Sequence, residues 1–222
     1  MKTIKTITLA LVVALGSLSA TAQNVSKKVD VAKSKATWKG YKVTGSHEGT
    51  VALSEGALIF NGEKLVGGNF TVNMTTINST DMTGEYKDKL DGHLKADDFF
   101  GVDKFPTAKL VFKSIGALGK NSYSVTADLT IKGKTAPVKF EISVYGSKAH
   151  ATLKIDRTVY DIKYGSSSFI TGLGDKAIYD EFDIVVDLQF EFLFEYIKNP
   201  QNQWFCGFFV LLMFAFIKFP YA

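Results

Sequence analysis

The chain has 222 residues, which suits one domain with extensions, and its 46% hydrophobic and 22% charged residues are unlike those of a disordered or collagen-like chain. The formal charge of +4 falls to +2 after residue 22, where 24 basic residues face 22 acidic ones, and Arg157 is the only arginine. A nearly neutral chain with a single guanidinium lacks the basic surface that nucleic-acid binding requires, so the composition argues against nucleic acid as a partner.

Residues 1–22 have the pattern of a cleaved export signal. Lys2 and Lys5 precede a short apolar run at 7–16, and Ala20 and Ala22 stand where a signal peptidase reads small residues. The run is shorter than the ~20 residues that a membrane-spanning helix needs, which disfavours an anchored helix. We therefore expect this segment to be removed and the mature protein to be periplasmic or secreted.

Residues 23–192 are dominated by alternating apolar and polar residues, the pattern of strands with one buried and one solvated face. The runs at 122–131 and 138–144 flank a glycine-containing turn and predict a hairpin whose second strand opens at Pro137. The longest alternation covers 181–192, and its phase is lost at Leu193. Further strands are predicted at 36–43, 49–53, 57–60, 69–75, 108–115 and 149–156.

One segment of this body has helical spacing. Residues 86–100 place Tyr86, Leu90 and Leu94 three to four residues apart among charged side chains, with Gly92 between them. We predict a short helix or turn, interrupted at Gly92, across one end of the sheet. Eight to ten strands with so little helix indicate an all-β fold, either a sandwich or a closed barrel whose interior is filled by side chains or holds one small ligand.

Residues 193–222 form an apolar tail of different composition. Nine of the 18 phenylalanines lie from Phe190 onwards, and the 14 residues at 204–217 include no polar side chain. Cys206, the only cysteine, has no partner for an intramolecular disulfide. Three interpretations stay open: a membrane anchor with Lys218 on the cytoplasmic side, an apolar helix or hairpin packed on the body, or a frameshift product beginning near Phe192.

Two segments of the body resemble the central signatures of the YceI-like family. The first is HLKADDFF at 93–100, followed by KFPTA at 104–108, and the second is ADLTIKGKTAPV at 127–138. WKG at 38–40 and GSHEG at 45–49 are similar to small exported members. The resemblance covers residues 30–192. This chain departs from the family pattern at Ala127, where members usually have glycine, and in the tail. It implies an antiparallel lipocalin-like barrel of about eight strands that binds a polyisoprenoid or other long amphiphilic lipid inside.

Such a lipid requires a continuous apolar interior, because a prenyl chain carries only methyl, methylene and methine groups. The resemblance therefore implies that apolar residues on the inward strand faces contact the ligand, although by pattern alone the same faces could be plain core. These expected ligand contacts are Phe60, Phe70, Val72, Phe112, Tyr123, Val125, Phe140, Ile142, Leu153, Phe182, Ile184 and Val186.

Three polar residues are candidates for contact with a lipid headgroup at the barrel mouth: His47, His93 and Arg157. A guanidinium can bind phosphate in a bidentate way, but Arg157 could equally form a surface ion pair with Asp156 or Asp161. The favoured alternative for His93 is structural, with Asp97 or Asp98, through hydrogen bonds to the loop that carries Phe99 and Phe100.

No motif in the chain specifies catalysis. His93 and Asp97 could be paired ligands, but two ligands do not make a zinc site without a third, and His150 falls on a polar strand face. Ser166–Ser168 lack the surroundings of a nucleophile elbow or a phosphate loop and suggest a flexible loop. We expect a non-enzymatic lipid-binding protein without a metal or cofactor, whose ligand is a polyprenyl lipid or, as an alternative, a quinone. The alternatives are a redox or stress-response factor linked to isoprenoid quinone, and a filled barrel that acts as an interaction module.

Overall fold

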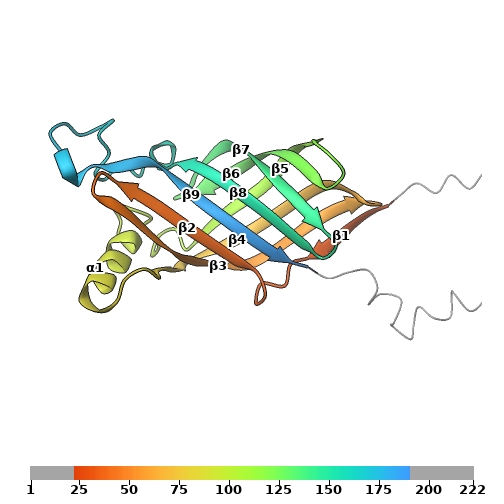
Figure 1. The fold of residues 1–222 in the computed structure, drawn as a ribbon, viewed down its shortest axis with the longest axis horizontal. Coiled ribbons are helices and arrows are strands. Elements are labelled where there is room, and N and C mark those ends of the chain that lie inside the picture. Colours follow the sequence, from red (N-terminus) through yellow and green to blue (C-terminus); the bar gives the residue numbers. More distant parts are fainter. Residues whose placement is uncertain (1–22, 191–222) are drawn as a thin grey trace, which may run out of the picture.

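The computed structural model describes residues 23–190, so the predicted signal segment and the apolar tail lie outside the described residues. This part of the chain contains nine strands, one α-helix and two short 3₁₀ helices, η1 (Arg157–Tyr160) and η2 (Gly174–Lys176). Figure 1 shows the strands as an elongated barrel with α1 (Gly84–Lys95) at one end. The strands are β1 (Asn24–Lys28), β2 (Lys35–Lys42), β3 (Gly45–Asn61), β4 (Lys64–Ser79), β5 (Thr107–Ala117), β6 (Ser122–Ile131), β7 (Lys134–Tyr145), β8 (Lys148–Asp156) and β9 (Ile178–Gln189).

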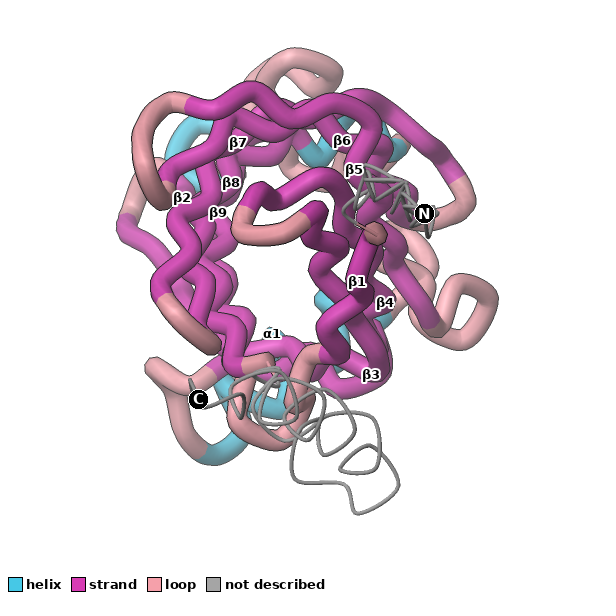
Figure 2. Tube along the Cα trace, turned by 90° about the vertical axis from the view of Figure 1, so that its right-hand side faces the viewer, coloured by secondary structure: helices cyan, strands magenta, loops and turns pink. Residues whose placement is uncertain are grey.

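All the strand pairings are antiparallel and they close a barrel (Figure 2). The order is β1-β3-β2-β9-β8-β7-β6-β5-β4, and pairing of β3 with β4 joins the two ends of the sheet. β2 pairs with residues Gly45 to Val51 of β3, and β1 pairs with residues Ala57 to Asn61 of the same strand. β1 and β2 therefore follow one another along β3 and together take one strand position in the barrel. The result is an eight-stranded barrel, which confirms the predicted fold class.

The predicted alternation is found in β6, where Tyr123, Val125 and Ala127 are buried and their neighbours are not. β3 shows why a long strand can be misinterpreted as two. Its register with β4 shifts between Leu53 and Glu55, and the buried positions change from odd to even numbers there. The strands predicted at 49–53 and 57–60 are therefore one strand, and the phase change between them is a bulge.

Two predictions about where a proline and a glycine interrupt regular structure are wrong. Pro137 does not open β7 but is its fourth residue, paired with Asp128 of β6. β8 pairs with β7 only from Glu141 on, so Pro137 interrupts no ladder with β8. Gly92 does not interrupt α1, which is continuous from Gly84 to Lys95, because a single solvent-exposed glycine only weakens a helix.

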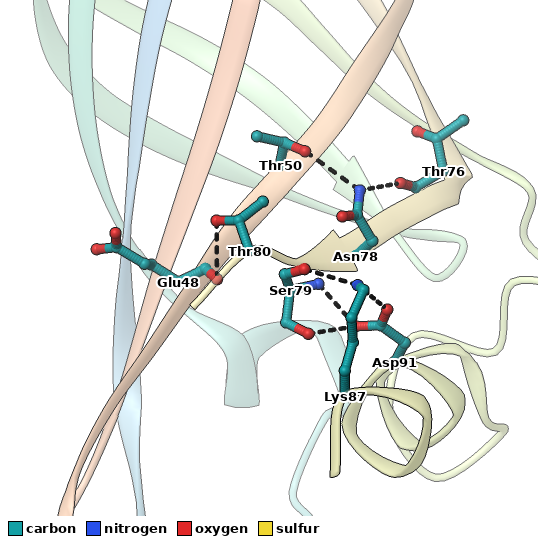
Figure 3. A network of polar contacts seen from close by, with 8 residues as sticks. All are labelled: Glu48, Thr50, Thr76, Asn78, Ser79, Thr80, Lys87 and Asp91. Carbon is teal, nitrogen blue, oxygen red and sulfur yellow. Dashed lines mark hydrogen bonds and ion pairs between the residues drawn. The ribbon is translucent and has the colours of Figure 1, made fainter. Parts of the chain in front are cut away.

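A polar network fastens α1 to the end of β4 (Figure 3). The Asp91 carboxylate accepts hydrogen bonds from the Ser79 backbone N–H at 2.6 Å and the Ser79 hydroxyl at 2.8 Å. Lys87 Nζ donates to Asp91 and to the Ser79 carbonyl, both at 2.6 Å. Burial would raise the pKa of Asp91, but these hydrogen bonds outweigh it and hold the pKa below its usual value. The helix is thereby held across one end of the barrel.

β1 lies at the opposite end of the barrel (Figure 1), and buried side chains fill the interior there. Leu58 is fully buried, and the rings of Phe60 and Phe190 pack with their centroids 5.9 Å apart. Tyr123 and Leu65 add to the same buried cluster, where the Leu65 N–H donates to the Tyr123 hydroxyl at 3.5 Å. We call this region the filled end. Within residues 23–190 no helix is long and apolar enough to cross a membrane.

Candidate ligand cavity

A cavity of about 180 Å³ occupies the barrel interior and reaches the end where α1 lies. Its lining comes from the inward faces of strands around the barrel and from the loop after α1. Nine of the twelve expected contact residues line it: Phe70, Val72, Phe112, Phe140, Ile142, Leu153, Phe182, Ile184 and Val186. The other three, Phe60, Tyr123 and Val125, are buried but do not line it. We call this region the hollow end.

Small inward residues leave the space open. Ala36, Ala108 and Ala151 all line the cavity, at positions where a leucine or phenylalanine would fill it. Phe182 and Ile184 also point inward, yet they keep more exposed surface than the buried core, because they face empty space. The cavity is therefore a consequence of side-chain size as well as of barrel closure.

Two glycines let large rings lie flat against the barrel wall. A Cβ atom at Gly56 would come within 2.6 Å of the Phe70 ring, and one at Gly68 within 2.8 Å of the Phe112 ring. The two rings are neighbours, with centroids 5.7 Å apart. Because no side chain separates these rings from the wall, they line the cavity without crossing it.

The end of α1 and the loop after it supply a second set of lining residues, which the sequence did not indicate as ligand contacts. Leu94, Phe99 and Phe100 are buried and line the cavity, and the Phe100 ring lies 6.5 Å from Phe182 across the barrel end. Their motif was apparent in the sequence, but helical spacing does not reveal that the loop turns into the barrel. Gly101, with φ +56°, makes that turn.

Arg157 is the only charged residue in the lining among the described residues, and it is 2% exposed. Its guanidinium donates to three backbone carbonyls: Ile162 at 2.7 Å, Ile178 at 3.0 Å and Tyr179 at 3.0 Å. The expected surface ion pair with Asp156 or Asp161 is wrong, because the side chain points inward. Its nearest carboxylate belongs to Asp180, at 3.6 Å.

A break in the strand ladder explains why an arginine is buried here. Gly40 pairs with Phe182, but Lys42, two residues further on, pairs with Ile178, so β9 has extra residues at this seam with β2. The pairing of β8 with β9 ends at Glu181. The guanidinium of Arg157 therefore supplies hydrogen bonds to carbonyls that lie beyond the regular ladder.

Burial shifts the pKa values of Arg157 and of the ionisable groups around it. Desolvation lowers the pKa of Arg157, and the carboxylates of Asp180 and Asp156 oppose that shift. Burial would raise the pKa of Asp180, but hydrogen bonds from serine hydroxyls and the charge of Arg157 bring it below its usual value. Burial raises the pKa of Tyr160 to about 12, so its hydroxyl stays neutral. Both Arg157 and Asp180 are charged at neutral pH, and the carboxylate of Asp180, outside the lining, partly offsets the one positive charge of the cavity wall.

The two candidate mouth histidines lie near the hollow end without lining the cavity. His47 Nδ1 is 2.9 Å from the carboxylate of Asp81, just before α1. His93 packs its ring against Tyr164, with centroids 4.3 Å apart, and against Phe99 at 5.5 Å. Its Nδ1 is 3.9 Å from Asp98, which is too long for a hydrogen bond. Contact of either histidine with a headgroup stays a prediction.

The serine loop has a defined turn structure. Ser166 is fully buried, and its carbonyl accepts hydrogen bonds from the N–H groups of Phe169 and Ile170 at 3.2 and 2.9 Å. Ser168 donates to Asp180 at 2.6 Å. These contacts tie the segment before β9 to the barrel end. Within residues 23–190 no three His, Cys, Asp or Glu side chains come together in a way that could hold a metal ion.

The fold and cavity define a closed antiparallel β-barrel with an apolar internal cavity that reaches one end. The sequence identifies the family: residues 28–190 match the model of the YceI-like domain, so the chain belongs to the YceI-like family. This finding confirms the resemblance carried by the two central motifs.

The chain is also similar to UPF0312 proteins of other bacteria. One from Shewanella denitrificans is 36% identical over 92 residues, covering 41% of this chain and 46% of that protein. One from Pseudomonas putida is 41% identical over 56 residues, or 25% of this chain and 29% of its own length. The matched stretches thus span less than half of these relatives.

Two solved structures share the fold. BcnA of Burkholderia cenocepacia superposes with a TM-score of 0.58 at 23% identity, covering 72% of this chain and 98% of that one. A polyisoprenoid binding domain from Saccharophagus degradans, implicated in plant cell wall breakdown, gives a TM-score of 0.55 at 14% identity and covers 75% and 98%. At such identities the likeness concerns the fold alone.

Proposed function

We propose that this protein is a non-enzymatic binding protein that holds the hydrocarbon chain of a polyisoprenoid, or of a similar long amphiphile, in the cavity of the hollow end. The observation that carries the proposal is the lining: apolar side chains from strands around the barrel, with Arg157 as the single charged member among the described residues. Burial of each CH₂ group of a ligand is worth ~0.8 kcal/mol, so such a cavity favours a long hydrocarbon chain and needs no reactive group.

The polyisoprenoid class is supported by the Saccharophagus domain, which has the same fold and is described as binding polyisoprenoid. The filled-barrel alternative is supported only at the filled end, because the cavity occupies the other part of the interior. A redox role would need a reacting group beside the ligand. The lining offers a guanidinium already engaged with three carbonyls, which supports binding over catalysis.

We place the polar end of the ligand at the hollow end, near Arg157. The filled end leaves no room for a headgroup, whereas the lining at the hollow end includes Tyr41 and Tyr179, which reach the surface. Three N–H groups of the guanidinium are engaged, so only its remaining N–H groups are open to a headgroup oxygen. His47 and His93 flank the same end and are the second candidates for this contact.

Filling the cavity tests the proposal. Ala151 is 4% exposed and lines the cavity, so Ala151→Phe should displace the chain and lower the uptake of a prenyl lipid at least about tenfold. The matched control is Thr152→Phe on the outer face of the same strand, which should bind as the wild type does. Native mass spectrometry with organic extraction measures the bound lipid.

Val186→Phe provides a second filling variant in case Ala151→Phe does not fold, since Val186 faces the cavity with part of its surface free. Thermal unfolding of each variant establishes that it is folded before uptake is compared. Folded variants of both kinds that still take up lipid like the wild type would contradict the proposal.

We also infer that the protein is exported. The support is the basic, apolar and small-residue succession in residues 1–22. N-terminal sequencing of the protein recovered from its natural host should begin at Gln23, whereas a retained Met1 would contradict export by cleavage. The intact mass of the same material tests the frameshift interpretation, because a chain that ends near Phe192 is lighter than one that retains residues 193–222.

A further inference from the structure

The hollow end carries a group of exposed apolar side chains that the cavity does not explain. We call this group the mouth patch; it comprises Val43, Tyr164, Phe169, Ile170 and Tyr179, each between 44% and 55% exposed. It comes from the β2–β3 turn, from the loop before β9 and from the start of β9. Figure 1 shows that loop projecting beyond the barrel at the same end as α1.

Backbone hydrogen bonds join these segments into one surface. The Val43 N–H donates to the Ala177 carbonyl at 3.2 Å, and the Ile178 N–H donates to the Gly165 carbonyl at 2.8 Å. Gly165, with φ +61°, lets the loop approach closely, since a Cβ atom there would lie 3.1 Å from Ile178. The patch is therefore built from neighbouring chain segments and is not a set of scattered residues.

The tip of the loop is held in an ordered turn. Both Phe169 and Ile170 donate their N–H groups to the buried Ser166, whose hydroxyl in turn accepts the N–H of Ser168 at 3.3 Å. Their side chains nevertheless point into solvent at 54% and 44% exposure. Because the turn already orders the backbone at these two residues, less entropy is lost when a partner binds.

Lysines accompany the apolar side chains. Lys163 Nζ lies 4.8 Å above the Phe169 ring, and its carboxylate partner Asp161 is shared with Lys134 of β7. Lys42 and Lys176 are exposed, and neither has an acidic partner among residues 23–190. Aromatic and aliphatic side chains interleaved with lysine are the composition that binds anionic membrane surfaces.

We propose that the mouth patch docks the hollow end of the barrel onto the surface of an anionic lipid bilayer. This inference rests on the proposed function, because docking at this end would let a hydrocarbon chain pass between bilayer and cavity without crossing water. Cavity lining and patch share Tyr179, so the two surfaces are continuous. A protein partner is the competing occupant, but Lys42 and Lys176, which adjoin the hydrogen-bonded residues Val43 and Ala177, favour lipid headgroups.

The test is binding of the full chain to vesicles of phosphatidylglycerol and phosphatidylcholine in equal parts, measured by flotation. The double substitution Phe169→Ser with Ile170→Ser should weaken binding about tenfold or more, because two apolar side chains no longer enter the interface. Lys42→Gln with Lys176→Gln should weaken it roughly fivefold or more and leave binding to pure phosphatidylcholine unchanged.

The matched control lies at the filled end. Leu118 and Tyr145 are as exposed as the patch residues but stand singly on separate turns, so Leu118→Ser with Tyr145→Ser should bind vesicles like the wild type. Hydrogen exchange of the vesicle-bound chain should show new protection in residues 164–170 and at the β2–β3 turn. This readout separates docking through the patch from attachment through residues 191–222.

The docking proposal is overturned if the wild type and the Phe169/Ile170 variant bind vesicles equally, or if the new protection is confined to other segments. It is also overturned if the wild type does not bind vesicles and the Phe169/Ile170 variant loses a protein partner. Uptake of a prenyl lipid from detergent solution is measured in parallel for every variant. If vesicle docking fails while this uptake persists, only the docking proposal falls. If uptake fails in the wild type, the proposed function falls.

Discussion

The two ends of this barrel are built from the same alternating strands but have different interiors. At the filled end the side chains of Leu58, Phe60 and Phe190 occupy the barrel interior, whereas further along the barrel Ala36 and Ala151 leave space for the cavity that reaches the hollow end. Strand pairing, twist and closure are shared, so they do not decide which end can hold a ligand. What decides it is the volume of the inward side chains, together with the glycines that let large rings lie against the wall.

The largest expected effect is a difference in stability between a variant of the filled end and a variant of the cavity lining. Phe60→Ala should lower the free energy of unfolding by about 3–5 kcal/mol, because it opens a hole in a packed region. Phe112→Ala should cost less, about 1–3 kcal/mol, because part of that ring already faces empty space. Urea unfolding of both variants measures the difference.

The affinity for a prenyl lipid should be affected more by Phe112→Ala than by Phe60→Ala, which is the reverse of their order for stability. Phe60→Ala should keep the wild-type affinity for a prenyl lipid, and Phe112→Ala should change it, since only Phe112 lines the cavity. Equal losses of stability in the two variants, with equal effects on binding, would mean that the filled and hollow ends are not distinct.

The next effect concerns the fastening of α1 to the hollow end. Asp91→Asn removes the charge that Lys87 and Ser79 bind and should cost about 1–3 kcal/mol at neutral pH. The pKa of Asp91 is below its usual value of 3.8 in the folded state, so its contribution is present above that value and is lost as the pH falls through the folded-state pKa.

The difference in stability between wild type and Asp91→Asn should therefore shrink below about pH 4. Thermal unfolding between neutral and acidic pH measures it, with Asp88→Asn on the exposed side of the helix as control. A difference that stays constant across this range would show that the Asp91 charge does not hold the helix.

The smallest effect concerns the middle of α1. Gly92 has open space where a Cβ would stand, so Gly92→Ala should stabilise the protein by about 0.5–1 kcal/mol without changing lipid uptake. The measurement is a rise in the midpoint of thermal unfolding. A fall would mean that the glycine is required by a contact or movement of the helix.

The alternation predicted an all-β sandwich or closed barrel, and the resemblance to the YceI-like family favoured the barrel. Nine of the cavity residues follow the alternation, but it was the resemblance that marked them as ligand contacts. The sequence did not distinguish the two ends. Phe60 and Phe70 have the same pattern, but only the three-dimensional register shows that Phe60 meets Phe190 while Phe70 lies against Gly56.

The sequence also did not predict that the side chain of Arg157 lies in the barrel interior. The strand predicted at 149–156 ends where β8 does, but nothing in Asp156-Arg157-Thr158 signals that β9 is irregular beside it or that three carbonyls converge on the guanidinium. A buried arginine that completes backbone hydrogen bonds is recognised only once the ladders are known. The same is true of Phe99 and Phe100, which the turn at Gly101 directs into the cavity.

The most direct test of the central claim is the affinity of the protein for a series of prenyl alcohols that grow by one isoprene unit at a time. The cavity account predicts that affinity rises at least about tenfold per added unit while the chain enters the hollow end, then stops rising when the cavity is full. In Ala151→Phe the plateau should come at a shorter chain. An affinity independent of chain length, or the same plateau in Ala151→Phe, would contradict the account.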